Sequence, residues 1–123
     1  MNPLRARGVL DRQSVLLIGD DVLAAFRLRQ HLVAAGARVI LGDARETLPY
    51  LAAPALAAVV VAADVNAIDR VGLVAALAAC PAPWVVYGPK APAEVVAAAD
   101  AHITNDPGLL VATLAAWLEP THH

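Results

Sequence analysis

The sequence has little of the chemistry that marks secreted and membrane proteins. Its single cysteine, Cys80, excludes a disulfide within these 123 residues and suits a reducing compartment. Charges or prolines interrupt every apolar run before the roughly 18 residues that a membrane span requires. The N-terminal residues lack an apolar segment followed by a cleavage site, so no signal peptide is expected. We therefore expect a cytoplasmic protein with no membrane contact.

Positive charge is also scarce. Nine lysine and arginine residues stand against eleven acidic ones, giving a net charge of −2, and Lys90 is the only lysine. This balance argues against nucleic-acid binding by the domain. The sequence also lacks a nucleophile elbow, a glycine-rich phosphate loop and His/Cys metal spacing. We therefore expect that the protein is not an enzyme.

Apolar residues, by contrast, are abundant. They make up 59% of the chain, and 123 residues are enough for one domain with a substantial core. The expected organisation is an N-terminal tail over residues 1–13, a domain over 14–119, and a C-terminal tail or tag remnant over 120–123.

Strand-like and helix-like segments alternate along this domain. The expected strands are 15–18, 38–41, 57–62, 84–87 and a short 101–104. The expected helices are 22–35, 45–53, 67–79, 93–99 and 107–118. Short connections between alternating elements imply right-handed crossovers and a parallel sheet covered on both faces. We predict an α/β fold: a single doubly wound, five-stranded, flavodoxin-like sheet with strand order 2-1-3-4-5.

Two of the helices have clear end signals. Asp21 is a plausible N-cap of the first helix, which ends before Gly36, and Asp106 before Pro107 starts the last one. The predicted core-facing residues of the first helix are Leu23, Phe26, Leu28, Leu32 and Val33. Those of the last helix are Leu110, Val111, Leu114, Trp117 and Leu118.

Acidic side chains follow several strands at the predicted carboxyl edge of the sheet. The buried run Val15–Ile18 leads through Gly19 to Asp20 and Asp21, and Asp64 follows the third strand. The first and third strands are neighbours in the predicted order, so these three carboxylates can converge into a site for Mg²⁺. The alternative is that Asp21 caps its helix and Asp20 faces water.

This pattern resembles the receiver domain of response regulators over nearly the whole chain. The first strand and its acid pair match, and Asp64 follows Asp21 at close to the family's spacing for the phospho-accepting aspartate. Residues 83–90, Pro-Trp-Val-Val-Tyr-Gly-Pro-Lys, resemble the fourth strand and its loop. Residues 99–107, Ala-Asp-Ala-His-Ile-Thr-Asn-Asp-Pro, resemble the family's segment around the fifth strand. The resemblance implies that Asp64 accepts phosphate and that Asp20, Asp21 and Asp64 bind Mg²⁺.

The chain departs from the family at its switch positions. Asn105 stands where the family has a phosphate-binding lysine, Gly88 where it has a hydroxyl residue, and His102 where it has an aromatic switch residue. Lys90 is a candidate substitute cation, although a solvated loop lysine is the simpler interpretation. The third strand's register also leaves Ala62 as an alternative to Asp64 at the acceptor position.

These departures favour an atypical, or pseudo-, receiver domain with impaired or absent phosphorylation that signals through protein contacts. The alternatives are a functional phospho-receiver using Asp64 and Mg²⁺, and a small flavodoxin-like ligand-binding module. By resemblance, the partners are a histidine kinase, an output domain or another regulator, in a system that regulates transcription. A homodimer is expected through the face of the fourth helix, fifth strand and fifth helix, which includes Val95, His102, Leu110 and Thr113.

Overall fold

The computed structural model describes residues 10, 12–19, 21–52, 56–62, 67–88, 91 and 93–118. Its strands are β1 (Ser14–Ile18), β2 (Arg38–Gly42), β3 (Ala58–Ala62), β4 (Trp84–Tyr87) and β5 (Ala101–Ile103). Its helices are α1 (Val22–Ala34), α2 (Ala44–Thr47), the 3₁₀ helix η2 (Leu48–Ala52), α3 (Ala67–Ala79), α4 (Ala93–Ala98) and α5 (Pro107–Leu118).

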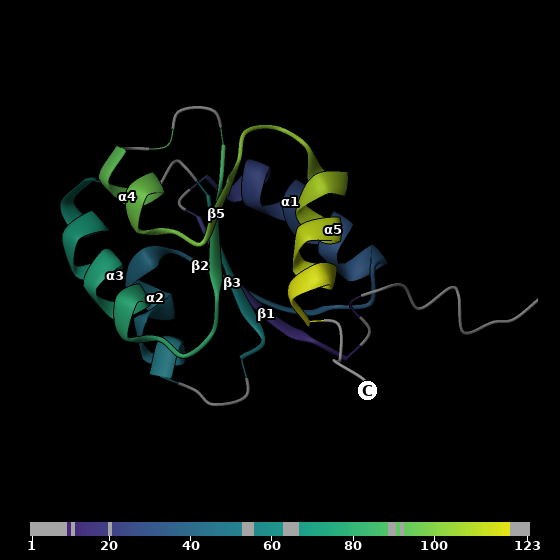
Figure 1. The fold of residues 1–123 in the computed structure, drawn as a ribbon, viewed down its shortest axis with the longest axis horizontal. Helices are drawn as coiled ribbons and strands as arrows, with labels where there is room; N and C mark the ends of the chain where they lie inside the picture. Colours follow the sequence, from purple (N-terminus) through teal and green to yellow (C-terminus); the bar gives the residue numbers. More distant parts are fainter. Residues whose placement is uncertain are drawn as a thin grey trace, which may run out of the picture.

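The strands form one parallel sheet in the order β2-β1-β3-β4-β5, as the sequence predicted. Helices α1 and α5 cover one face, and α2, α3 and α4 cover the other (Figure 1). Each face has its own core because successive side chains of a strand point to opposite sides. Val15 and Leu17 pack beneath α1 and α5, whereas Leu16 and Ile18 pack on the other side.

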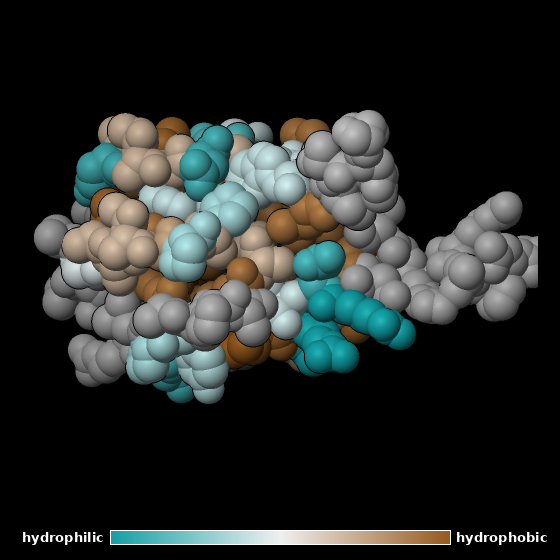
Figure 2. Space-filling model, turned by 60° about the horizontal axis from the view of Figure 1, so that its bottom comes forward, coloured by the Kyte–Doolittle hydropathy of each residue, from teal (hydrophilic) through white to brown (hydrophobic). Residues whose placement is uncertain are grey.

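The central strands are buried on both faces, which explains their continuous apolar runs. Every residue of β3 is buried, and so are four of the five residues of β1. Figure 2 turns the amino-terminal edge of the sheet forward and shows hydrophobic residues reaching the surface between hydrophilic patches. Within the described residues, no helix has the length and apolar character needed to cross a membrane.

The second predicted helix is divided in the structure. Expected over 45–53, it consists of α2 followed directly by η2. A residue that precedes proline is disfavoured in α-helical conformation. Pro49 therefore explains why the α-helical hydrogen bonding ends at Thr47 and continues as a tighter 3₁₀ turn.

The predicted inner side of α1 is partly wrong. Leu28 and Leu32 are buried as expected, but Leu23 is 72% exposed, and Phe26 and Val33 are also exposed. The small residues Ala25 and Ala35 occupy the remaining core positions of this helix region. Small residues thus face the sheet at these positions, and the larger Leu23, Phe26 and Val33 lie on the outward side. By contrast, the predicted stripe of α5 packs against the core along its whole length.

Two residues of the predicted contact face are not at the surface. Val95 and Leu110 are buried in the two cores, so neither can touch a partner. His102 is exposed and Thr113 is half-buried, and these two remain candidates for contacts.

The described core extends into the segment predicted to be a tail. Leu10 is fully buried and belongs to the core beneath α1 and α5. Its N–H donates to the carbonyl oxygen of Ala35 at 2.8 Å, and the N–H of Arg12 donates to that of Gly36 at 3.2 Å. Leu10 thus closes the amino-terminal end of the core beside the end of α1.

Candidate functional site at the carboxyl edge

The carboxyl edge of the sheet is where several helices begin, and the described acids there cap those helices. Asp21 is the N-cap of α1, and its Oδ1 accepts from the N–H of Ala24 at 3.1 Å. Asp106 precedes α5, and its Oδ1 accepts from the N–H of Leu109 at 2.9 Å. Both caps were anticipated from the sequence, because aspartate satisfies the unpaired N–H groups of a helix's first turn.

A third cap, at α2, was missed. The Oδ1 of Asp43 accepts from the N–H of Glu46 at 2.7 Å, and Glu46 Oε1 accepts in return from the N–H of Asp43 at 2.9 Å. This reciprocal pair is a capping box. The Asp-x-x-Glu spacing at 43–46 was the signal that could have revealed it. Asp43 therefore caps the amino terminus of the short helix α2.

The other predicted ligands of a metal lie outside the described residues. Asp20, Asp64 and Lys90 all fall there. Within the described part of the chain, no group of three His, Cys, Asp or Glu side chains is placed to hold a metal ion. The predicted site of Asp20, Asp21 and Asp64 therefore stays a prediction.

The strand register relates the described strand ends that precede Asp20 and Asp64 in the sequence. Ile18 pairs with Val61, and Ala62 pairs with Tyr87. Ala62, the alternative position for the acceptor, is buried and ends β3. Asp64 follows this strand end by two residues, and Asp20 likewise follows the end of β1. The described ends of β1 and β3, which are neighbouring parallel strands, thus lie at the same edge of the sheet, and Asp20 and Asp64 follow these ends in the sequence.

Gly88, at the predicted switch position after β4, has a backbone conformation that favours glycine. Its φ is 139°, in the range that residues with a Cβ rarely adopt. The residue is buried, and its N–H donates to the carbonyl oxygen of Ile103 at 2.8 Å. The backbone conformation at position 88 therefore favours glycine over a residue that carries a hydroxyl.

His102, at the other predicted switch position, is hydrogen-bonded to this same glycine. Its Nε2 lies 2.8 Å from the carbonyl oxygen of Gly88. A carbonyl oxygen only accepts, so Nε2 carries the hydrogen in this contact. Gly88 is consequently held to β5 through both its N–H and its C=O. Asn105, at the position of the family's lysine, is exposed.

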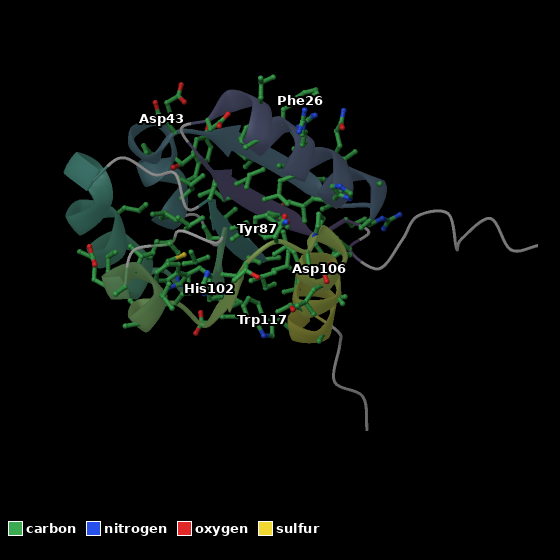
Figure 3. The ribbon with its side chains drawn as sticks, turned by 90° about the horizontal axis from the view of Figure 1, so that it is seen from above. Phe26, Asp43, Tyr87, His102, Asp106 and Trp117 are labelled. Carbon is green, nitrogen blue, oxygen red and sulfur yellow. The ribbon has the colours of Figure 1, made fainter. Side chains whose placement is uncertain are left out.

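Tyr87, at the end of β4, interacts electrostatically with Asp106, which precedes α5. Tyr87 is half-buried against the core beneath α1 and α5. Burial, together with the negative charge of Asp106, raises the pKa of the Tyr87 hydroxyl above its ordinary value. Figure 3 looks down on this edge and shows Tyr87 near its centre, with His102 and Asp106 on the side away from Asp43.

Comparisons with known proteins give a consistent account of the fold. No protein-family model matches the chain, and no curated protein matches it. Among solved structures, it is similar to the receiver domain of the sensor histidine kinase PA1611 from Pseudomonas aeruginosa, which was crystallised with magnesium in its active-site cleft. The TM-score is 0.75 at 16% identity, covering 89% of this chain and 99% of that one.

Two further structures show the same likeness. A CheY-like receiver domain from Methanospirillum hungatei has a TM-score of 0.75 at 18% identity, with 89% of this chain and 95% of that chain covered. Full-length FixJ from B. japonicum has a TM-score of 0.73 at 22% identity, with 89% and 61% covered. The chain therefore has the fold of response regulator receiver domains.

Proposed function

We propose that this chain is an atypical receiver module that signals through protein contacts and whose phosphorylation switch is impaired. The observation that carries the proposal is the geometry of Gly88. A receiver's response to phosphate depends on a hydroxyl that forms a hydrogen bond to the phosphoryl group at this position. Gly88 has no hydroxyl, and its φ of 139° disfavours any residue that would supply one.

The contact between Gly88 and His102 supports the same proposal. The two residues occupy the switch positions, and they are hydrogen-bonded to each other at 2.8 Å. Movement of the loop after β4 would break this bond and also the bond from Gly88 N–H to Ile103. With no phosphate-bound hydroxyl to compensate for these losses, the unphosphorylated arrangement is favoured.

Asn105 weakens the phosphate site itself. A lysine at this position would offer a full positive charge to a phosphoryl oxygen. Asn105 offers a neutral amide, and a charge-assisted hydrogen bond is roughly twice as strong as a neutral one. We therefore expect slow phosphoryl transfer to Asp64, the candidate acceptor, even where Mg²⁺ is bound.

The acids at this edge have the chemistry that Mg²⁺ requires. Carboxylate oxygens are its preferred protein ligands, and the PA1611 receiver domain was crystallised with magnesium in its cleft. In this chain we assign the metal role to Asp20 and Asp64, with Asp21 contributing beside its capping bond. Bound Mg²⁺ would neutralise the acids and an incoming phosphoryl group.

The partners proposed for the module are a histidine kinase, an output domain or another regulator of a two-component system. Its place in such a system, including transcription regulation, is inferred from the receiver fold. The face of α4, β5 and α5 remains a candidate for partner contact through the exposed His102 and the half-buried Thr113. We propose no catalytic activity of the module on other molecules.

Phosphorylation can be tested directly. The protein is incubated with Mg²⁺ and acetyl phosphate, and its intact mass is followed over time beside the Asp64→Ala variant. We expect no stable gain of a phosphoryl group. A stable gain that disappears in Asp64→Ala would overturn the proposal and establish a functional phospho-receiver.

A structural readout separates phosphorylation from switching. Amide spectra of Gly88, His102 and Ile103 are recorded by NMR with Mg²⁺, before and after addition of beryllofluoride as a phosphoryl mimic. The proposal predicts that these three signals stay in place. Large coordinated shifts at all three would show an intact switch and contradict it.

A further inference from the structure

Most of the large exposed apolar side chains among the described residues come from one segment of the chain, which includes an edge strand of the sheet. Among the described residues, the large exposed hydrophobics are Leu23, Phe26, Val33, Leu41, Tyr50 and Leu109. All but Leu109 belong to the continuous segment from α1 through β2 to η2. In Figure 3, Phe26 and Asp43, which follows β2, lie on one side of the molecule, and His102 and Trp117 lie on the other.

That side carries the edge strand β2. In the described sheet, β2 pairs with β1 alone, and its sequence is Arg-Val-Ile-Leu-Gly. Natural proteins commonly protect an exposed edge with proline, a bulge or charges within the strand. The three central residues of β2 are all apolar, and its one charge, Arg38, stands at the beginning. This edge is therefore suited to pairing with another strand.

The hydrogen bonds of β2 show which backbone groups face outward. The N–H of Arg38 donates to Gln13 at 2.8 Å, and the carbonyl oxygen of Gly42 accepts from Gly19 at 3.0 Å. Both groups thus point toward β1. Because the direction alternates along a strand, the N–H and C=O groups of Val39 and Leu41 point toward the open edge.

We propose that two copies of this chain associate through β2, as an antiparallel pair whose two-fold axis passes beside Ile40. In this register, Val39 of each copy lies opposite Leu41 of the other. An antiparallel ladder alternates hydrogen-bonded and non-hydrogen-bonded pairs. Both Val39–Leu41 pairs are then of the hydrogen-bonded kind, and all four outward groups find partners. A contact of this kind is self-complementary, as two-fold symmetry requires.

Charge at the two ends of β2 favours the same register. Antiparallel pairing brings Arg38 of one copy to the end of the other copy's strand, where Asp43 and Glu46 follow Gly42. Arg38 lies on the same face of the strand as Ile40, which packs in the core that also contains Leu51 of η2. Gly42 shares this face with Arg38, and a Cβ on Gly42 would meet Glu46 Oε1 at 3.2 Å, so Glu46 lies on this face too. The pairing therefore creates two symmetric attractions between opposite charges.

Apolar contact on the other face adds to the ladder. Val39 and Leu41 lie on the side of the sheet that α1 covers, since Val39 and its pairing partner Val15 belong to that core. Phe26 and Val33, two helical turns apart, are exposed on α1. Association would bring these side chains of both copies together around the paired strands and remove them from water.

The oligomeric state tests this proposal. Sedimentation of the full chain is measured up to about 1 mM, the range in which weak association is detected. We expect a dimer whose Kd rises at least about tenfold in Leu41→Lys and in Arg38→Glu. The matched control is Leu109→Lys, the same change at an exposed leucine of α5, which should leave Kd unchanged. A monomer at every concentration, or a dimer weakened only by Leu109→Lys, overturns the proposal.

Amide hydrogen exchange supplies an independent readout. The N–H groups of Val39 and Leu41 should exchange quickly in dilute solution and slowly in concentrated solution. The N–H of Ile40 points toward β1, so its exchange should be slow at both concentrations. Exchange at Val39 and Leu41 that does not depend on concentration contradicts the proposal, even if a dimer forms elsewhere.

Discussion

The imidazole of His102 donates from Nε2 to the carbonyl oxygen of Gly88 across 2.8 Å, which joins two residues that are 14 positions apart in the chain. The same glycine donates its N–H to Ile103 and has a φ of 139°. The two predicted switch positions are therefore bonded directly to each other. Glycine is what permits this backbone geometry.

A Cβ at position 88 should destabilise the fold. Gly88→Ala places a substituted residue in a strained backbone region, and we expect a loss of about 1–3 kcal/mol in the free energy of unfolding. Urea denaturation measures this loss. The control is Gly72→Ala in α3, where a Cβ meets nothing within 4 Å. That change should stabilise the protein by about 0.5–1 kcal/mol. Equal effects at the two sites would contradict the role assigned to φ at Gly88.

The pKa of the Tyr87 hydroxyl should depend on the charge of Asp106. Burial and the Asp106 charge raise its pKa, so the folded state holds this proton more tightly than the unfolded state. The resulting stabilisation is fully present below the ordinary pKa of about 10 and is lost as pH rises through the folded-state value. Asp106→Asn keeps a capping side chain and removes the charge. We expect it to lower the pKa of Tyr87, as measured by ultraviolet titration against a Tyr87→Phe blank.

Burial would still raise this pKa in Asp106→Asn, so only part of the shift should disappear. A pKa of Tyr87 that is unchanged in this variant would show that burial alone causes the shift. Tyr50→Phe serves as the background control, because it removes the exposed tyrosine signal without touching the end of β4.

The capping role of Asp21 can be separated from a role in metal binding. Asp21→Ser keeps an N-cap acceptor, so its stability should stay within a few tenths of a kcal/mol of the parent. Asp21→Ala removes the bond to the N–H of Ala24 and should cost about 1 kcal/mol. Thermal and urea unfolding without Mg²⁺ measure both. If Asp21→Ser is as unstable as Asp21→Ala, hydrogen bonding at the cap is not the role of this side chain.

Adjacent leucines in α5 should behave very differently. Leu110 is fully buried, and Leu110→Ala should cost about 2–5 kcal/mol because it leaves a cavity. Leu109 is 51% exposed, and Leu109→Ala should change stability by less than about 0.5 kcal/mol. Similar losses for the two variants would contradict the burial that removes Leu110 from the predicted contact face.

Patterns that depend on neighbours in the chain were predictable. The strands and the caps at Asp21 and Asp106 followed from apolar runs and cap residues, which act over a few positions. The order of the sheet followed from the flavodoxin-like fold that the alternation of strands and helices predicts. The positive φ of Gly36 at the end of α1 likewise matches its expected role as a terminator. By contrast, Asp20, Asp64 and Lys90 lie outside the described residues, and their roles stay predictions.

The inner side of α1 was not predictable from its pattern. Apolar residues occur all around this helix, so periodicity alone does not indicate which of them faces the sheet. In the structure Ala25, Leu28 and Leu32 are buried against the sheet, whereas Leu23 and Phe26 are exposed. The predicted contact face is a different case. Leu110 was predicted both to face the core and to lie on this face, and the structure buries it together with Val95, so His102 and Thr113 are the members of the face left to make contacts.

The sequence alone determined the fold class of this protein, its helix caps at Asp21 and Asp106 and the residues at its predicted switch positions, because strand runs, helix caps and residue identities are local properties. Only the tertiary structure decided which contacts those residues make. The bond between His102 and Gly88 and the outward backbone groups of Val39 and Leu41 depend on how separate strands lie side by side. Such relations arise from packing across the sheet, and no local pattern of residues encodes them.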